Sequence, residues 1–304
     1  MHSSKKRFRA YILLLISTIV AAAAFIVVEP ALKHATVFQY LFYRFLLAAV
    51  LITPWLFHLL KRQKNQRLFW MIFWVEIVGV VIYLPLLYLG LARSTAIETS
   101  LLATTTPLFI ILAGVVWLKE KQTRREWTGL AISLIGMLII TALPLLNGAV
   151  GLSRASIGGN LLIVLSNCAG AAYAILAKAY YRKVPPLLAA GISFWLGTIA
   201  FGILSMGFYQ LSFSALLSGM VVDLQHPSVL FATIYMAIFC SIIGLITFIK
   251  GQKLIEASEA GLFTYLQPLI YLPLGVLLLG EAISIYQILG LGLVLIGVWI
   301  SETR

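Results

Sequence analysis

Apolar runs of about 20 residues recur along nearly the whole of this 304-residue chain. A run of that length crosses the roughly 30 Å hydrocarbon core of a bilayer as an α-helix. Only 11% of the residues are charged, against roughly a quarter in soluble domains. The pattern predicts an all-α integral membrane protein. Hydropathy gives ten spans, near residues 10–28, 35–60, 68–92, 95–117, 126–144, 158–181, 187–210, 228–252, 258–279 and 285–300.

The net charge is +12, and the positions of the basic residues indicate how the chain is oriented in the membrane. The basic residues lie in the short gaps between the apolar runs and do not gather on one face or helix, so we expect no nucleic-acid partner. With a cytoplasmic N-terminus, 18 of the 22 Lys and Arg fall on the inner side and three on the outer side. Because cytoplasmic loops are rich in Lys and Arg, we predict a multi-pass cell-membrane protein with both termini cytoplasmic. The semi-apolar stretch 213–222 is predicted to lie along the interface.

The chain repeats itself at an offset of 161 residues. Residues 96–136 align with residues 257–297 without a gap, with 14 identities in 41 positions. Because each repeat would hold five helices, an odd number, the second must enter the membrane from the opposite side. We therefore predict two inverted-topology halves, residues 1–150 and 151–304. The matched pairs include Glu98 with Glu259, Pro107 with Pro268, Gly129 with Gly290 and Gly136 with Gly297.

Short motifs in both halves resemble a known family. They are Tyr88-Leu89-Gly90-Leu91-Ala92, Pro107-Leu108-Phe109, Leu118-Lys119-Glu120, Gln267-Pro268-Leu269, Leu279-Gly280-Glu281 and, in the second span, Arg44-Phe45. They look like the EamA-type branch of the drug/metabolite transporter superfamily. The resemblance implies a ten-helix transporter in which helices one, three, four, six, eight and nine surround a central cavity, while helices five and ten are peripheral. Lys119 departs from the usual Gly of this pattern, which Gly280 keeps.

Two ionisable side chains, Arg44 and Glu76, fall inside predicted spans, where a charge is costly. Three interpretations are open. The two groups form a structural bridge, or Glu76 is a cavity carboxylate that binds a substrate ammonium or a coupling proton, or the side chains snorkel to the interface. Tyr83 lies on the same helix face as Glu76, so a cavity-facing Glu76 would bring Tyr83 with it.

Two prolines at equivalent positions of the repeat, Pro107 and Pro268, are predicted to kink the fourth and ninth helices. Each kink frees a backbone carbonyl that needs a partner in lipid. Threonines near the kink either satisfy that carbonyl or present polarity to a ligand, and an asparagine in mid-span bonds either a neighbouring helix or a ligand. The further candidates for substrate binding are Thr105, Thr106, Asn167, Tyr173, Thr264, Gln267 and Tyr271.

The sequence carries no HExxH, GxSxG or P-loop motif and no paired-cysteine metal spacing, so we expect no enzyme, cofactor or metal. We predict a secondary transporter, exporting a small metabolite such as an amino acid or similar zwitterion by alternating access. A proton or other ion gradient, or the substrate's own gradient, would supply the energy. The alternatives are a multidrug or organic-cation exporter and, from another class, a non-transporting membrane scaffold. The expected assembly is a monomer or homodimer.

Overall fold

The computed structural model is a bundle of helices, and its described part contains no strand. Among the described residues, six helices are long and apolar enough to cross a membrane: Arg7–Ala31, Val37–Leu59, Gln66–Leu91, Ile157–Ala177, Leu187–Tyr209 and Pro227–Phe248. They coincide with the first, second, third, sixth, seventh and eighth predicted spans. The structure describes residues 2–62, 66–103, 105–106, 109, 112–113, 123–146, 154–181, 184–252, 254, 263, 267–280 and 283–302.

Four of these spans are uninterrupted α-helices. Pro186 opens the fourth of them, and Gln210 closes it in the left-handed conformation at φ 54°. A helix satisfies its own backbone hydrogen bonds, which lipid cannot do, so the apolar runs fold this way. The four helices are α1 (His2–Ala31), α2 (Val37–Arg62), α8 (Arg154–Tyr181) and α9 (Pro186–Tyr209).

The third and eighth spans both widen into a π-helix partway through. The wider turns, η1 and η2, end at Tyr83 and Gly244, which lie 161 residues apart, at the offset of the sequence repeat. Because π-helical turns occur frequently at functional sites, this shared position directs attention to the two spans. Their elements are α3 (Gln66–Glu76), η1 (Ile77–Tyr83), α4 (Leu84–Leu91), α11 (Pro227–Ile234), η2 (Tyr235–Gly244) and α12 (Leu245–Gln252).

The remaining predicted spans are shorter or described only in part. The fourth and ninth, which carry the predicted kinks, continue into residues outside the described ranges. Gly280 ends the ninth span at a positive φ of 67°, which glycine adopts without strain. The elements are α5 (Ala96–Ala103), α7 (Arg124–Leu146), α14 (Gln267–Leu274), η4 (Gly275–Leu279) and α15 (Ile285–Glu302).

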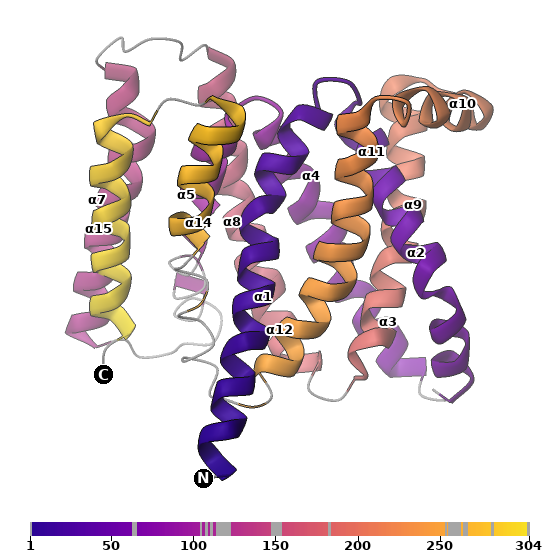
Figure 1. The fold of residues 1–304 in the computed structure, drawn as a ribbon, viewed down its shortest axis with the longest axis horizontal. Coiled ribbons are helices and arrows are strands. Elements are labelled where there is room, and N and C mark those ends of the chain that lie inside the picture. The colour runs from indigo at the N-terminus through magenta and orange to yellow at the C-terminus, as the bar shows by residue number, and fades with distance from the viewer. Residues whose placement is uncertain are drawn as a thin grey trace.

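One helix, α10 (Phe213–Asp223), lies across the ends of the others, whereas its neighbours run along the bundle (Figure 1). The Ser212 hydroxyl caps its first turn by accepting a hydrogen bond from the Ala215 amide at 3.2 Å. The predicted interfacial segment is therefore a helix of its own.

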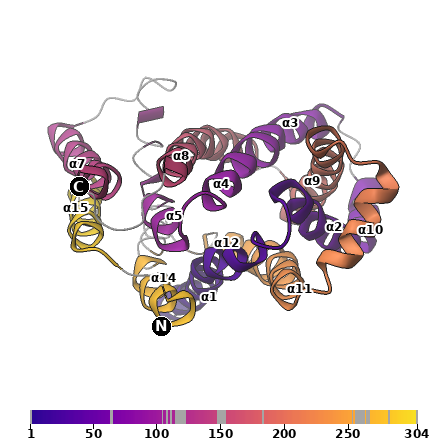
Figure 2. The ribbon, with the colours of Figure 1, turned by 90° about the horizontal axis from the view of Figure 1, so that it is seen from above.

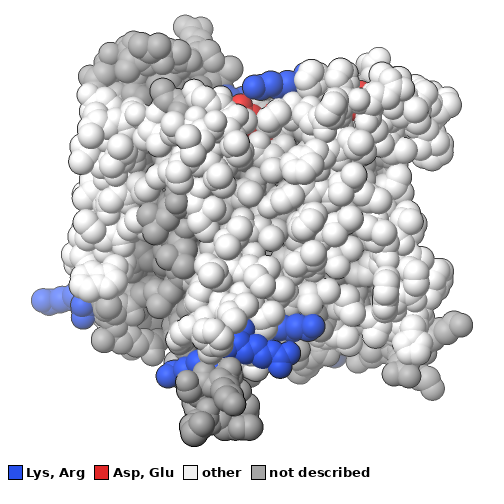
Figure 3. All heavy atoms as spheres, in the orientation of Figure 1, with Lys and Arg blue, Asp and Glu red and all other residues white. Residues whose placement is uncertain are grey.

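The helices pack in a reciprocal pattern. α1 packs against η2, α12 and α14, while α8 packs against α4, η1 and α5. α2 pairs with α9, and α7 pairs with α15 at one side of the molecule (Figures 1 and 2). On the face shown in Figure 3, charged side chains lie at the two ends of the bundle and leave an uncharged band between them.

Glycines allow α7 and α15 to touch backbone to backbone. A Cβ on Gly136 would lie 2.6 Å from the Gly290 carbonyl oxygen, and one on Gly297 would lie 2.4 Å from the Gly129 carbonyl oxygen. Ser133 links the helices by donating a hydrogen bond to the Val294 carbonyl at 3.2 Å. The glycine stripes of the sequence thus form a seam within one chain.

Candidate functional site

Arg44, in the first half of α2, is a buried charge with 8% of its surface exposed. Its Nη1 donates a hydrogen bond to the Tyr88 hydroxyl on α4. The guanidinium carbon lies 5.0 Å from the centre of the Phe45 ring and 5.6 Å from that of the Tyr88 ring. Its Nε is buried and has no hydrogen-bond partner in the described part of the chain. The protein therefore gives this five-donor group one hydroxyl acceptor and two ring faces.

A second layer of aromatic side chains holds this arrangement. The Tyr40 ring stacks on Tyr88 with centroids 6.0 Å apart, and its hydroxyl donates to the Ala232 carbonyl of α11 at 3.2 Å. We call Arg44, Tyr40, Phe45 and Tyr88 the Arg44 cluster, and it joins α2 to α4 and to the α11–η2 span.

The contacts within the Arg44 cluster do not offset the free energy that it costs to bury the Arg44 charge. Removing an ion from water costs several kcal/mol even after relaxation. A cation–π contact returns about 0.5 to 2 kcal/mol, and a hydrogen bond involving a charged group returns about 1.5 to 3 kcal/mol. The rings and the Tyr88 hydroxyl offset part of the cost, and a negatively charged partner for Arg44 would offset the rest.

Glu76, the last residue of α3, is a buried acidic side chain with 2% of its surface exposed. The Tyr173 hydroxyl of α8 donates to its Oε1 at 3.5 Å, and the Ser193 side chain of α9 is a second hydrogen-bond partner. Gly79 leaves space for the Tyr173 ring, because a Cβ at this position would lie 2.4 Å from the ring. Glu76 is thus held by hydroxyl groups from two other helices.

In the described part of the chain, Arg44 and Glu76 have different hydrogen-bond partners. Arg44 turns to Tyr88, and Glu76 turns to Tyr173 and Ser193. The positions of Arg44 and Glu76 along their helices place the two residues at similar depths in the membrane. Whether their side chains meet depends on the direction in which each leaves its helix. Here each of them faces a different neighbour.

Tyr83 and Tyr173, two predicted site residues, pack reciprocally across the contact between η1 and α8. The Tyr173 ring lies over Gly79, and the Tyr83 ring lies over Gly170, where a Cβ would be 3.1 Å away. Tyr173 therefore contacts both Gly79 and Glu76, while Tyr83 contacts Gly170 on the same helix as Tyr173.

Thr105, Thr106 and Asn167 form a closed hydrogen-bond network at the predicted kink of the fourth helix. Asn167 Nδ2 donates to the Leu102 carbonyl and to Thr105 Oγ1, both at 2.9 Å. Thr106 Oγ1 bonds the Asn167 Oδ1 at 3.1 Å and the Ala103 carbonyl at 2.7 Å. Ala103 carries the carbonyl that a proline at 107 would free. These side chains therefore satisfy the backbone and each other, which favours a structural role for all three.

The candidates on the ninth helix are only partly described. Thr264 and Pro107 lie outside the described residues, and of Pro268 only the backbone, at the start of α14, is described. Gln267 is half-buried at the first position of α14. Tyr271 is 1% exposed, and its hydroxyl has no hydrogen-bond partner in the described part of the chain.

Replacing Tyr271 with phenylalanine is expected to stabilise the protein in the absence of substrate. An unsatisfied buried polar group costs about 1 to 3 kcal/mol, and phenylalanine removes the hydroxyl while keeping the ring. The midpoint of thermal unfolding in detergent should rise. A fall in the midpoint would mean that the hydroxyl has a partner that stabilises the fold.

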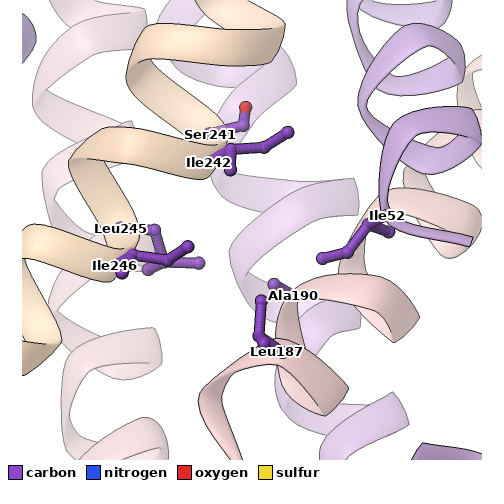
Figure 4. Close-up of a pocket in the computed structure, with 7 residues that line it drawn as sticks. All are labelled: Ile52, Leu187, Ala190, Ser241, Ile242, Leu245 and Ile246. Carbon is purple, nitrogen blue, oxygen red and sulfur yellow. The ribbon is translucent and has the colours of Figure 1, made fainter. Parts of the chain in front are cut away.

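Two cavities lie beside the η2–α12 span. One, of about 240 Å³, lies between α1 and the η2–α12 span and is lined by Ser17, Val20, Ala21, Cys240, Gly244, Leu245 and Phe248. The other is small and apolar, between α2, α9 and the η2–α12 span (Figure 4). It is lined by Ile52, Leu187, Ala190, Ser241, Ile242, Leu245 and Ile246.

Sequence reasoning missed Tyr40, Tyr88 and Ser193 as site residues. Tyr40 precedes Arg44 by four positions and so shares its helix face, which is a signal that the sequence contained. Tyr88 belongs to a motif that carried the family resemblance. Ser193 offered no signal, because one serine in an apolar run is common. Among the described residues, no group of three His, Cys, Asp or Glu side chains could hold a metal ion.

The apolar helices that are long enough to span a bilayer define a multi-pass membrane protein. A profile described as the EamA-like transporter family matches residues 8–142 and 157–303. The chain belongs to this family, and it is a transporter and not an enzyme.

Similar proteins agree with this assignment. An uncharacterized transporter of Archaeoglobus fulgidus is 25% identical, covering 97% of this chain and 98% of its own. The uncharacterized transporter YyaM of Bacillus subtilis is 24% identical over 96% of this chain and 93% of its own. A solved crystal structure, described only as that of a protein, has a TM-score of 0.53 and 16% identity, covering 98% of this chain and 95% of its own. That last likeness concerns the fold alone.

Proposed function

We propose that this protein is a secondary transporter that exports a small zwitterionic metabolite, such as an amino acid, by alternating access. The observation that carries the proposal is the presence of two buried ionisable side chains of opposite kind, Arg44 and Glu76, which bond different neighbours. A guanidinium suits a carboxylate, and a carboxylate suits an ammonium group. A zwitterion supplies both groups.

The proposal includes two five-helix halves of inverted topology, residues 1–150 and 151–304. The seam between α7 and α15 supports it, because the contact of Gly136 with Gly290 is matched by that of Gly297 with Gly129. An offset of 161 residues exchanges the two contacts. Contacts that map onto each other in this way are expected of two halves related by a two-fold axis in the membrane plane.

Hydrogen bonds between α1 or α8 and the other half support the same architecture. Asn167 on α8 donates to the carbonyl of Leu102, and Thr18 on α1 donates to the carbonyl of Phe263 at 3.3 Å. Leu102 and Phe263 are also 161 residues apart. The first helix of each half would then donate a hydrogen bond to an equivalent carbonyl of the other half. Such an arrangement suits rocking of the two halves between two related states.

We place the protein in the cell membrane with both termini cytoplasmic. The bias of Lys and Arg toward one side supports this orientation. On the face shown in Figure 3, most basic side chains lie at the end of the bundle where the N-terminus is.

Purified protein in liposomes tests the transport proposal directly. Vesicles preloaded with labelled amino acids, or with organic cations, are diluted into label-free buffer, with and without an imposed pH gradient. Efflux of at least one amino acid above that of empty liposomes is expected. Absence of efflux for the whole panel would refute the proposal. Efflux of cations alone would favour the cation exporter, which Glu76 beside the Tyr173 ring makes the second candidate.

Replacing Glu76 with glutamine is expected to lower this efflux about tenfold or more and to abolish its dependence on the pH gradient. Glutamine keeps the shape of the side chain but can neither carry a proton nor offer a negative charge to an ammonium group. Loss of one charge-assisted hydrogen bond of about 1.5 to 3 kcal/mol is enough for a change of that size.

Glu29→Gln is the matched control for Glu76→Gln. Glu29 forms a 3.6 Å ion pair with Lys33, whose side chain is 66% exposed, so the pair contributes little. It also accepts a hydrogen bond from the Ala96 amide at 3.1 Å, and glutamine keeps an oxygen that can accept it. Efflux and its pH dependence should stay at the original level in this variant. Unchanged efflux and pH dependence in Glu76→Gln itself would assign Glu76 to the structure of the bundle.

A further inference from the structure

The Arg44 cluster contains a positive charge for which the described part of the chain supplies no anion. Its guanidinium has one hydrogen-bond acceptor, the Tyr88 hydroxyl, and a buried Nε without a partner. Five N–H donors in a planar fork are the geometry that binds two carboxylate oxygens at once. A site of this kind is complete only when a carboxylate occupies it.

The acidic side chains described nearby have other partners. Glu76 is held by Tyr173 and Ser193. Asp223 accepts a 2.7 Å hydrogen bond from the hydroxyl of Tyr43, the residue next to Arg44 on α2. Asp223 thus bonds the tyrosine next to Arg44 and not Arg44 itself.

We propose that Arg44 binds the carboxylate of the transported molecule and that Tyr88 is the residue that positions the guanidinium for it. This inference rests on the proposed transport function and names the substrate class: molecules with one carboxylate and a body that is uncharged or carries an ammonium group. A single guanidinium balances one negative charge, which suits a carboxylate better than a phosphate dianion. The rings of Tyr40 and Tyr88 supply an apolar wall beside the bound group.

The test compares amino acids with their own amides, which lack only the carboxylate. Full-length protein in lipid nanodiscs is titrated with the twenty amino acids, each paired with its amide, and binding is read from the rise in unfolding temperature and from displacement of a labelled ligand. At least one acid should bind about thirtyfold or more tightly than its amide, because the amide leaves Arg44 without its anion. Equal binding of acid and amide, or binding of neither, would overturn the inference.

Substitutions then assign the effect to Arg44. In Arg44→Gln the preference for acid over amide should disappear, with the affinity for the amide unchanged; a purely structural role would weaken both ligands alike and overturn the inference. Arg44→Lys should restore part of the preference, since lysine keeps the charge without the fork. Arg93→Gln, at an exposed position after α4, is the matched control and should keep the full preference.

Tyr88→Phe keeps the test decisive if Arg44→Gln does not fold. Phenylalanine preserves the ring beside Arg44 and removes the hydroxyl that accepts its hydrogen bond. The affinity for the acid should fall about tenfold while that for the amide stays the same, and an equal loss for both would overturn the positioning role. If acids bind selectively but show no efflux from liposomes, the carboxylate site is supported and the transport function is refuted. If acids and amides show equal efflux, transport is supported and the carboxylate site is refuted.

Discussion

Replacing Gly297 with alanine is expected to destabilise the protein by about 3 kcal/mol, through the seam between α7 and α15. The new Cβ would lie 2.2 Å from Ser133 Oγ and 2.4 Å from the Gly129 carbonyl oxygen. Side chains can rotate away, but a helical carbonyl cannot, so the two helices must separate along the seam. Thermal unfolding in detergent, followed by the loss of helical signal or of monodisperse protein, measures the effect.

A glycine on the same helix provides the control for this prediction. A Cβ added at Gly292 would meet no heavy atom within 4 Å, and alanine is the better helix former by about 1 kcal/mol. Gly292→Ala should therefore leave the unfolding midpoint unchanged or raise it. If Gly297→Ala behaves in the same way as Gly292→Ala, the two helices do not touch at the seam.

The same seam indicates how much of the fold the sequence could predict. The offset of 161 residues paired Gly136 with Gly297 and Gly129 with Gly290, and the contacts of α7 with α15 join these four residues. Glycines repeated at helical spacing predict close packing because only glycine lets backbones meet. They do not say which helix is the partner, which depends on how the whole bundle closes.

The π-helical turns η1 and η2 could not be predicted. Both lie in unbroken apolar runs, and hydropathy cannot distinguish a helix with wider turns from a regular one. Their shared position in the repeat, ending at Tyr83 and Gly244, became visible only in three dimensions. Wider turns rotate the residues that follow, so helix-face arguments across such a turn lose accuracy.

The sequence identified the charged residues of the candidate site but not the residues to which they form hydrogen bonds. Arg44 and Glu76 were identifiable because a charge in an apolar run is costly. Their partners were not, since Tyr88, Tyr173 and Ser193 come from three other elements. The choice between a bridge and two separate groups depended on side-chain directions, which sequence spacing along single helices does not give.

Replacing Asn167 with alanine is expected to destabilise the protein by about 3 kcal/mol, the second large effect. Asn167 is 1% exposed, and its amide makes hydrogen bonds to Leu102, Thr105 and Thr106. Each such bond contributes about 0.5 to 1.5 kcal/mol. Alanine removes all three and leaves a space at the end of α5, where lipid offers no replacement partner.

The next residue along α8, Cys168, is the control for Asn167. Cys168 is exposed, so Cys168→Ala should change the unfolding midpoint little. Thr106→Val, which removes a single hydroxyl of the same network, should give an intermediate loss. Because these side chains satisfy one another and the backbone, the loss should appear in the unfolding midpoint without ligand. If Asn167→Ala instead unfolds at the original temperature and loses only ligand affinity, Asn167 contacts the substrate and the network is part of the binding site.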